Sequence, residues 1–214
     1  MSNIIAFSGT HSTGKSTTVN DLKNQPDFYI DDFKVSRFVQ QKLGYAKLEE
    51  AYKTPEKLIE FQMEILGQKA DHDGELLDNP KLKHKTIIVE RSLFDIAAYT
   101  NLWLKRVLAS EYNAFLPTEY REELRKWSEA FSRKCLTMQS WLYGGVALFL
   151  INDDVAFVED PNRADYYSRQ WIQDEILMLS TTLIGPPVKM ISHADRSYRV
   201  TQIKNFAKDL RYAK

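Results

Sequence analysis

The chain has 214 residues, and its 29 basic and 29 acidic side chains cancel to a formal net charge of zero. This length suits one domain with a sizeable core. A protein that follows a nucleic-acid backbone usually carries a basic excess, so a nucleic-acid partner is disfavoured and a small-molecule partner is expected, while a local basic patch stays open. The single cysteine, Cys135, has no disulfide partner, which fits a reducing cytoplasm and a packing role.

No apolar run approaches the roughly 20 residues of a membrane span, and the N-terminal apolar stretch is too short for a signal peptide. We therefore expect a cytoplasmic protein with no membrane partner. The oligomeric state is left open by the sequence, a homodimer included.

Short apolar runs alternate with long helical patterns along the chain, which predicts a parallel sheet with helices on both faces. The strand candidates are residues 4–8, 28–35, 86–90, 146–152 and 188–191. Helices are predicted at residues 17–22, 38–42, 54–77, 93–107, 120–142 and 200–210, with Pro117-Thr118 as a start signal for the fifth. We expect one α/β domain over residues 1–214, a three-layer αβα sandwich around a five-stranded parallel sheet.

Residues 9–16 read Gly-Thr-His-Ser-Thr-Gly-Lys-Ser, a complete G-x-x-x-x-G-K-[ST] phosphate-binding loop between a predicted strand and a predicted helix. Gly9 and Gly14 let the backbone turn so that successive N–H groups converge on phosphate oxygens. The positive end of the following helix adds to this attraction. Lys15 supplies a charge to the terminal phosphates, and the Ser16 hydroxyl can ligate Mg²⁺. The loop therefore predicts binding of ATP with Mg²⁺.

The third predicted strand ends in Glu90-Arg91-Ser92, at the edge of the sheet where ligands bind. Glu90 could ligate Mg²⁺ through water, accept the proton of an attacking hydroxyl, or be an ordinary surface carboxylate. Arg91 cannot lose its charge and suits a phosphate or developing negative charge. Ser92 can cap the next helix. Asp95 could orient Arg91, bind a substrate hydroxyl, or only complement the helix dipole.

Further arginines follow the second and fourth strands. Arg37 is expected in the loop after the second strand, close to the acceptor, unless it is simply solvated. Arg163 and Arg169 lie in a polar segment that would sit above the phosphates and could close over them as a lid, at about residues 153–170. They are six residues apart, so one uninterrupted helix would not point both the same way, and Arg169 could instead pair with Asp165.

The phosphate loop, the Glu90-Arg91-Ser92 block with Asp95, Ala98 and Tyr99, and the 159–169 cluster together resemble the phage-type, AAA-ATPase-labelled nucleotide kinases. These P-loop proteins are akin to deoxynucleoside and deoxynucleoside monophosphate kinases and to ribosylnicotinamide kinase. The resemblance spans most of the chain, and the phosphate loop is its most specific motif.

By position, the resemblance implies that Lys15, Ser16 and Thr17 bind ATP and Mg²⁺, that Glu90 and Arg91 serve the reaction centre, that Arg37 serves the acceptor, and that Arg163 and Arg169 serve the lid. The residues expected around ATP and Mg²⁺ are Gly9, Thr10, His11, Ser12, Thr13, Gly14, Lys15, Ser16 and Thr17.

One departure concerns the catalytic base. Such kinases often carry an acid just before the arginine that follows the second strand, and here the chain reads Val35-Ser36-Arg37, with Asp31 and Asp32 as the nearest acids. Glu90 or Asp95 is then left as the base. Because a phosphate acceptor needs little base catalysis, this departure favours a monophosphate acceptor.

We therefore expect a small-molecule kinase that moves the terminal phosphoryl group of ATP to a nucleoside or nucleoside monophosphate, chiefly by positioning and electrostatics. The alternatives are an ATP-hydrolysing switch or motor, a kinase acting on modified bases or ends in DNA, and a binding module whose loop is only structural. The lid arginines argue against the ATP-hydrolysing switch, and the neutral net charge argues against the kinase acting on DNA. The complete loop argues against the binding module.

Overall fold

The structure is a computed structural model, and it describes residues 3–155, 157, 166–182 and 185–212. Five parallel strands form one sheet in the order β2-β3-β1-β4-β5. The strands are β1 (Ile4–Ser8), β2 (Phe28–Ile30), β3 (Thr86–Glu90), β4 (Gly145–Phe149) and β5 (Val188–Ile191). The predicted five-stranded parallel sheet is confirmed.

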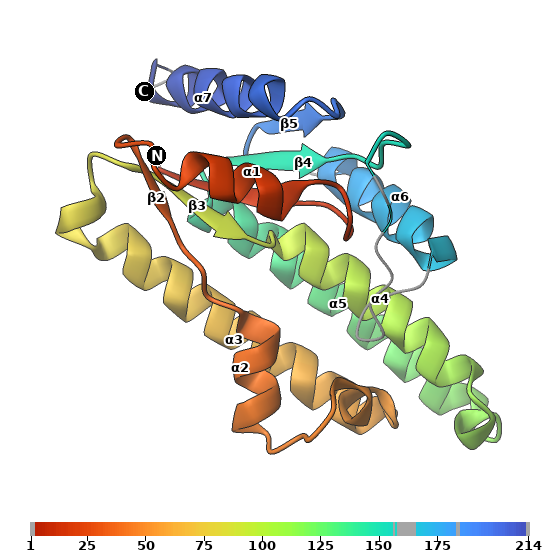
Figure 1. The fold of residues 1–214 in the computed structure, drawn as a ribbon. Coiled ribbons are helices and arrows are strands. Elements are labelled where there is room, and N and C mark those ends of the chain that lie inside the picture. Colours follow the sequence, from red (N-terminus) through yellow and green to blue (C-terminus); the bar gives the residue numbers. More distant parts are fainter. Residues whose placement is uncertain (1–2, 156, 158–165, 183–184, 213–214) are drawn as a thin grey trace.

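Helices cover both faces of this sheet. They are α1 (Lys15–Leu22), α2 (Val35–Lys42), α3 (Pro55–Asp78), α4 (Leu93–Ala109), α5 (Thr118–Leu142), α6 (Tyr166–Thr182) and α7 (Arg196–Tyr212). Short 3₁₀ helices occur at Leu48–Tyr52, Pro80–Leu82 and Glu111–Asn113. Figure 1 shows α1 and α7 on one side of the sheet and the long helices α3, α4 and α5 on the other. The three-layer αβα sandwich is therefore confirmed.

The central strand β1 explains why the phosphate loop emerges where it does. Ile4 and Ala6 pack into the core that faces α3 to α6, and Ile5 and Phe7 pack into the core that faces α1 and α7. A parallel strand buried on both faces reads as a continuous apolar run. Because β1 lies between β3 and β4, the loop after Ser8 starts at the middle of the carboxyl edge of the sheet.

Two strand boundaries expected from the sequence are wrong. The strand expected at 28–35 ends at Ile30, because the Asp31 carboxylate accepts the Phe33 N–H at 3.3 Å and turns the chain. The helix expected at 38–42 accordingly begins at Val35. The strand expected at 146–152 is Gly145–Phe149, because the amide of Ile151 donates to the side chain of Gln173 rather than to a neighbouring strand.

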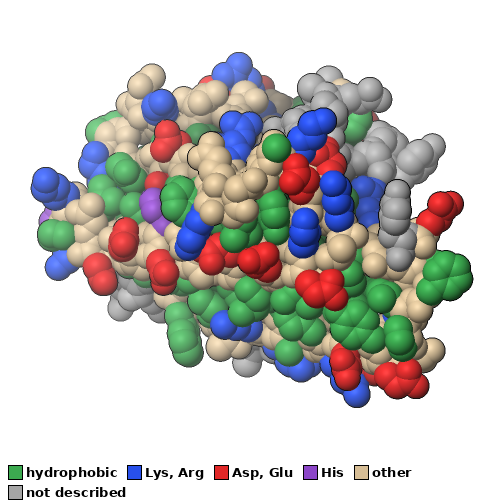
Figure 2. All heavy atoms as spheres, turned by 90° about the horizontal axis from the view of Figure 1, so that it is seen from below, with side chains coloured by type: hydrophobic (Ala, Val, Ile, Leu, Met, Phe, Trp, Pro, Cys, Tyr) green, Lys and Arg blue, Asp and Glu red, His purple; other side chains and the backbone are tan. Residues whose placement is uncertain are grey.

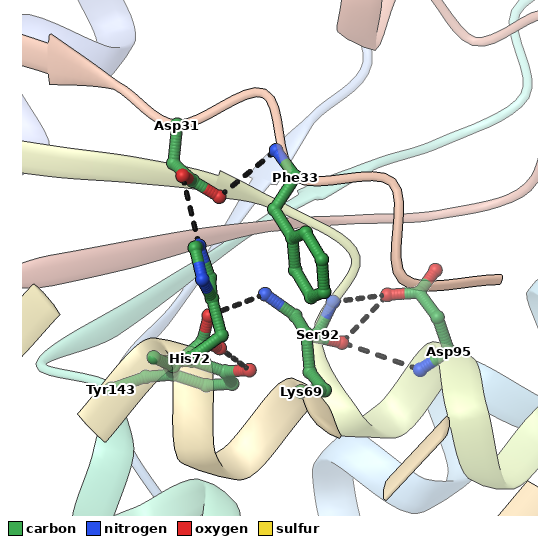
Figure 3. Close-up of polar contacts among 8 residues, drawn as sticks. Asp31, Phe33, Lys69, His72, Ser92, Asp95 and Tyr143 are labelled. Atoms are coloured by element: carbon green, nitrogen blue, oxygen red, sulfur yellow. Dashed lines mark hydrogen bonds and ion pairs between the residues drawn. The ribbon is translucent and has the colours of Figure 1, made fainter. Parts of the chain in front are cut away.

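A buried ion pair within α3 accepts a hydrogen bond from the segment between α5 and β4. Lys69 and Asp73 are both buried, with Nζ and Oδ1 2.8 Å apart, and the Tyr143 hydroxyl donates to the other Asp73 oxygen at 2.7 Å (Figure 3). Burial and the Asp73 charge raise the pKa of Tyr143 well above its usual value, so the phenol remains a donor. The Tyr143 bond thereby joins α3 to the connection between α5 and β4.

We expect Lys69→Met to lower the free energy of unfolding by about 3–5 kcal/mol, because it leaves the Asp73 carboxylate buried without its cation. The double variant Lys69→Met/Asp73→Leu should recover much of that loss, since no buried charge remains. Urea unfolding of the two variants measures both effects. Equal losses in the two variants would contradict a charge-pairing role.

The surface mixes charge of both signs. On the face shown in Figure 2, Lys and Arg side chains are interspersed with Asp and Glu and with hydrophobic side chains.

Cys135 is buried in the core, and burial raises the pKa of its thiol to about 12, which confirms a packing role. None of the helices in the described ranges combines the length and apolar character that a membrane crossing requires.

Candidate active site

The phosphate loop adopts the conformation that its glycines permit. Gly9 and Gly14 have φ values of 123° and 86°, a region that side chains disfavour. A Cβ at Gly9 would lie 2.3 Å from the carbonyl oxygen of Phe149, so the loop passes too close to β4 for any other residue. Helix α1 begins directly after Gly14 and has no side-chain cap, which leaves its first N–H groups directed at the loop.

Lys15 lies folded over this loop. Its ammonium group donates to the carbonyl oxygen of Gly9 at 2.6 Å, to the carbonyl oxygen of Thr10, and to the Thr13 hydroxyl at 3.3 Å. The positive charge therefore lies within the turn of the loop. A phosphate entering the loop would meet this ammonium group together with the α1 N-terminus.

Glu90 ends β3 next to the loop. The Ser16 hydroxyl donates to one of its carboxylate oxygens at 3.2 Å, and the Lys34 ammonium pairs with the other. Burial disfavours the charged carboxylate, but the hydrogen bond from Lys34 and the charges of Lys34 and Lys15 outweigh it and hold the pKa of Glu90 below its usual value. Glu90 is therefore ionised at neutral pH.

Ser16 and Glu90 together offer the oxygen ligands that Mg²⁺ prefers. Within the described ranges, no group of three or more His, Cys, Asp or Glu side chains forms a metal cluster. Mg²⁺ held here would accordingly take its remaining ligands from phosphate oxygens and water, as is usual where the ion accompanies a nucleotide. Ser16 and Glu90 fit that arrangement.

Arg91 presents a fixed charge from a strained backbone. Its φ of 66° is uncommon for a residue with a side chain, and its N–H donates to the carbonyl oxygen of Phe7 at 3.0 Å. The guanidinium carbon lies 4.8 Å from the centre of the Tyr99 ring, within the range of a cation–π contact. Tyr99 thereby holds the Arg91 charge at the edge of the cavity described below.

Asp95 connects this strand end to the phosphate loop. It is fully buried, and one carboxylate oxygen accepts the Gly9 N–H at 2.9 Å. The other accepts the N–H of Ser92 at 2.8 Å and its hydroxyl at 2.7 Å (Figure 3). Ser92 and Asp95 form a capping box at the start of α4. The structure thus places Asp95 beneath the loop, where it serves the helix and the loop rather than an acceptor hydroxyl.

One cavity of about 490 Å³ brings the two halves of the site together. One side is the phosphate loop through Thr17, and Glu90 and Arg91 also line the cavity. The opposite side is formed by residues of α2, α3, α4 and the 3₁₀ helix Leu48–Tyr52: Val35, Ser36, Leu48, Tyr52, Gln62, Ile65, Ile96, Tyr99 and Trp103. The cavity therefore joins a phosphate-binding surface to a mixed aromatic and polar one.

The aromatic side of this cavity suits a flat ring. The Tyr52 and Trp103 rings stack on each other with centres 4.0 Å apart and planes 4° apart. Gln62, only 3% exposed, adds an amide that can both donate and accept hydrogen bonds. Aromatic walls with a few polar groups are typical of pockets for small heterocyclic ligands.

The acids nearest to Arg37 do not reach this cavity. Asp31 is buried, and its carboxylate is 3.0 Å from the ring nitrogen Nε2 of His72. Among the described residues that line the cavity, Glu90 is the one carboxylate. Of the two carboxylates that the sequence left as the base, Glu90 is therefore the one that faces the cavity.

The expected loop position of Arg37 is wrong. Arg37 lies in the first turn of α2, is exposed, and does not line the cavity. The shortened β2 explains this, because it moves the helix start forward to Val35. Lys34, just before the helix, is instead the cation that reaches Glu90.

The two lid arginines have different outcomes. Residues 158–165, which include Arg163, lie outside the described part of the chain. Arg169 lies in the first turn of α6, is buried, and donates from Nη2 to the carbonyl oxygen of Ser12 at 2.9 Å. Arg169 therefore connects α6 directly to the phosphate loop.

The sequence did not predict the cavity residues Gln62 and Trp103, or Lys34, the partner of Glu90. Lys34 falls within the strand expected at 28–35, and Gln62 lies on a helix with an apolar pattern. Tyr99 and Trp103 are four residues apart on α4, a spacing that places two large aromatic side chains on one helix face beside Arg91. That spacing was the available signal.

The fold and the loop define a P-loop protein, and a family model described as an AAA domain matches residues 4–183, so the chain belongs to this AAA-domain family. No curated protein matches the sequence. A solved structure of deoxyadenosine kinase from M. mycoides with bound dATP is similar, with a TM-score of 0.62 and 14% identity. The match covers 97% of this chain and 100% of that one. At this identity the match shows that the chain has the fold of a P-loop kinase.

We expect Asp95→Asn to lower the free energy of unfolding by about 1–3 kcal/mol, because an amide replaces a carboxylate that accepts hydrogen bonds from buried donors. It should also weaken ADP binding, since the one remaining amide oxygen cannot accept from Gly9 and Ser92 in their present positions and the NH₂ group meets a donor. Ser92→Ala, which leaves the Gly9 bond intact, is the matched control for ADP binding. Urea unfolding and ADP titration measure the two effects. Equal ADP affinity in Asp95→Asn and wild type would show that Asp95 does not shape the loop.

Proposed function

We propose that the protein transfers the terminal phosphoryl group of ATP to a nucleoside or nucleoside monophosphate, with a deoxynucleoside monophosphate as the favoured acceptor. The observation that carries this proposal is the single cavity in which the phosphate loop faces an aromatic and amide surface, with Glu90 and Arg91 between them. The family membership and the kinase-like fold support a nucleotide substrate.

The donor side would hold ATP through the N–H groups of the loop and α1, with Lys15 on the terminal phosphates. Ser16 and ionised Glu90 would hold Mg²⁺, which supplies positive charge to the phosphate oxygens when it is bound. An acceptor oxygen would attack the terminal phosphorus while the bond to the bridging oxygen breaks, and ADP would leave. Lys15 and Arg91 would balance the negative charge that spreads over the transferring group.

The charge around Glu90 favours a phosphate as the acceptor. Glu90 is paired with Lys34, hydrogen-bonded by Ser16 and ionised at neutral pH, while Arg91 adds a further cation to the cavity. A hydroxyl acceptor needs a base, whereas an acceptor phosphate is already ionised and needs mainly countercharge. The acceptor base would lie against Tyr52 and Trp103, with Gln62 reading its polar edge.

The lid completes the proposal. The bond from Arg169 to Ser12 supports an α6 that responds to the state of the loop. Arg163 is proposed as a second lid cation on sequence grounds alone. Closure would exclude water and so favour transfer over hydrolysis.

The choice of acceptor draws on two resemblances. The similar solved structure is a deoxyadenosine kinase, which supports a deoxynucleoside-type acceptor and keeps a nucleoside hydroxyl open. The sequence motifs resemble those of phage-type nucleotide kinases, which supports the same class. An ATPase or a kinase for bases or ends within DNA is the alternative.

The test is a product screen with ATP, Mg²⁺ and a panel of deoxynucleosides, their monophosphates, ribonucleosides, nicotinamide riboside and oligonucleotides. ADP formation should be slow alone and rise at least about 10-fold with the cognate acceptor, because water is excluded from the closed site. Lys15→Ala should remain folded and lose nearly all transfer. Rapid ADP formation that no acceptor stimulates would contradict the kinase proposal and favour an ATPase.

We expect Glu90→Gln to lower kcat by about 100-fold or more while changing ADP affinity by only a few-fold, since Glu90 would act on the transferring group. Lys34→Met, which removes the partner and keeps the carboxylate, should change kcat far less. Steady-state kinetics and ADP titration separate the two quantities. Unchanged kcat with weakened ADP binding would place Glu90 outside the reaction centre.

A further inference from the structure

A buried arginine of α7 lies directly against the phosphate loop. Arg199 is only 4% exposed. A Cβ placed on Gly14 would meet Arg199 Nη1 at 1.8 Å and Cζ at 2.8 Å, so the guanidinium group occupies the space that the glycine leaves open. Gly14 is also the residue just before α1 and lines the cavity. The guanidinium group is therefore at the N-terminal end of α1.

Two nitrogens of this guanidinium group have no hydrogen-bond acceptor among the described residues. In the part of the chain that the structure describes, Nε and Nη1 of Arg199 are buried and have no partner. Arg196, one turn earlier, donates to both carboxylate oxygens of Asp21, at 3.1 and 2.5 Å. Burial and the neighbouring Arg196 charge lower the pKa of Arg199. The charges of Asp21 and Asp195 raise it, but they do not outweigh the lowering. A buried cation without acceptors is unfavourable unless a ligand supplies them.

The sheet order shows which part of a nucleotide would meet Arg199. The proposed acceptor groups lie on the β2–β3 side of β1, on α2, α3 and α4. Helix α7 packs against α1 and β5, on the other side. Since the terminal phosphate must face the acceptor, the rest of the donor has to extend away from it, towards α7.

We propose that Arg199 binds a non-transferred phosphate of the donor nucleotide at the N-terminus of α1. This inference rests on the proposed phosphoryl transfer and adds a residue that the phosphate-loop motif does not contain. The guanidinium group and the N–H groups of the first α1 turn would bind the same phosphate from two sides. Because that phosphate keeps its charge during transfer, the contact strengthens binding equally before and during the reaction, and affects KM rather than kcat.

The test compares Arg199→Met and Arg199→Lys with Arg196→Met, the matched control on the same helix. Calorimetry measures the affinity of each for ADP and for inorganic tripolyphosphate. Arg199→Met should bind both about 10- to 100-fold more weakly, as expected for loss of a charge-assisted hydrogen bond, and Arg199→Lys at least about 3-fold more weakly. Arg196→Met should match wild type. At saturating ATP, kcat should stay within about 3-fold in every variant.

Stability separates a binding role from a structural one. Arg199→Met should melt at or above the wild-type temperature without ligand, because it removes an unpaired buried cation. Should it fail to fold, the Arg199→Lys affinities decide in its place. Unchanged affinity for ADP, or a loss seen with ADP but not with tripolyphosphate, would overturn the phosphate contact. Wild-type protein that binds no ADP would overturn the proposed function as well, which distinguishes the two failures.

Discussion

The buried carboxylate of Asp95 is the interaction on which the rest of the site depends. One of its oxygens holds the first amide of the phosphate loop, at Gly9, and the other holds Ser92 at the start of α4. The phosphate loop follows β1, and Glu90, Arg91 and the cavity residues of α4 lie at or after the end of β3. The Asp95 carboxylate bonds to both strand ends and thereby fixes the position of the loop relative to the start of α4. A buried carboxylate that accepts several donors tolerates little displacement, because each lost bond leaves a buried polar group unsatisfied.

From this junction the polar groups divide into two sides. Towards the proposed acceptor side, Arg91 is turned into the cavity by an unfavourable backbone conformation and held by Tyr99. Away from it, Arg199 fills the space beside Gly14. Lys15 lies between them over the loop. The arrangement places positive charge along the proposed path of a triphosphate. It also places Glu90, the one carboxylate among the described cavity residues, at the proposed point of transfer. Such preorganised charge is the main source of catalysis in phosphoryl transfer.

The sequence predicted the sheet, the layers and the phosphate loop, because these follow from local patterns: an apolar run, a glycine-rich turn and helical spacing. It did not resolve the role of Asp95, although Ser92 three residues earlier matches a capping box, because the bond to Gly9 spans 86 residues. It misplaced Arg37 and did not predict the role of Lys34. The Asp31 side chain accepts the Phe33 N–H and ends the strand at Ile30, which the residue pattern did not indicate. The sequence did not indicate a role for Gln62 or Arg199. Both lie on long helices, and tertiary packing decides which residues of such a helix face the site.

The most direct test of this account is the affinity of bisubstrate ligands in which adenosine is joined through a polyphosphate chain to each nucleoside of the acceptor panel. If the phosphate loop and the aromatic surface share one cavity as donor and acceptor sites, at least one such ligand should bind about 100-fold or more tightly than ADP, with one molecule per chain, because the second contact becomes intramolecular. Bisubstrate ligands that all bind no more tightly than ADP would contradict it.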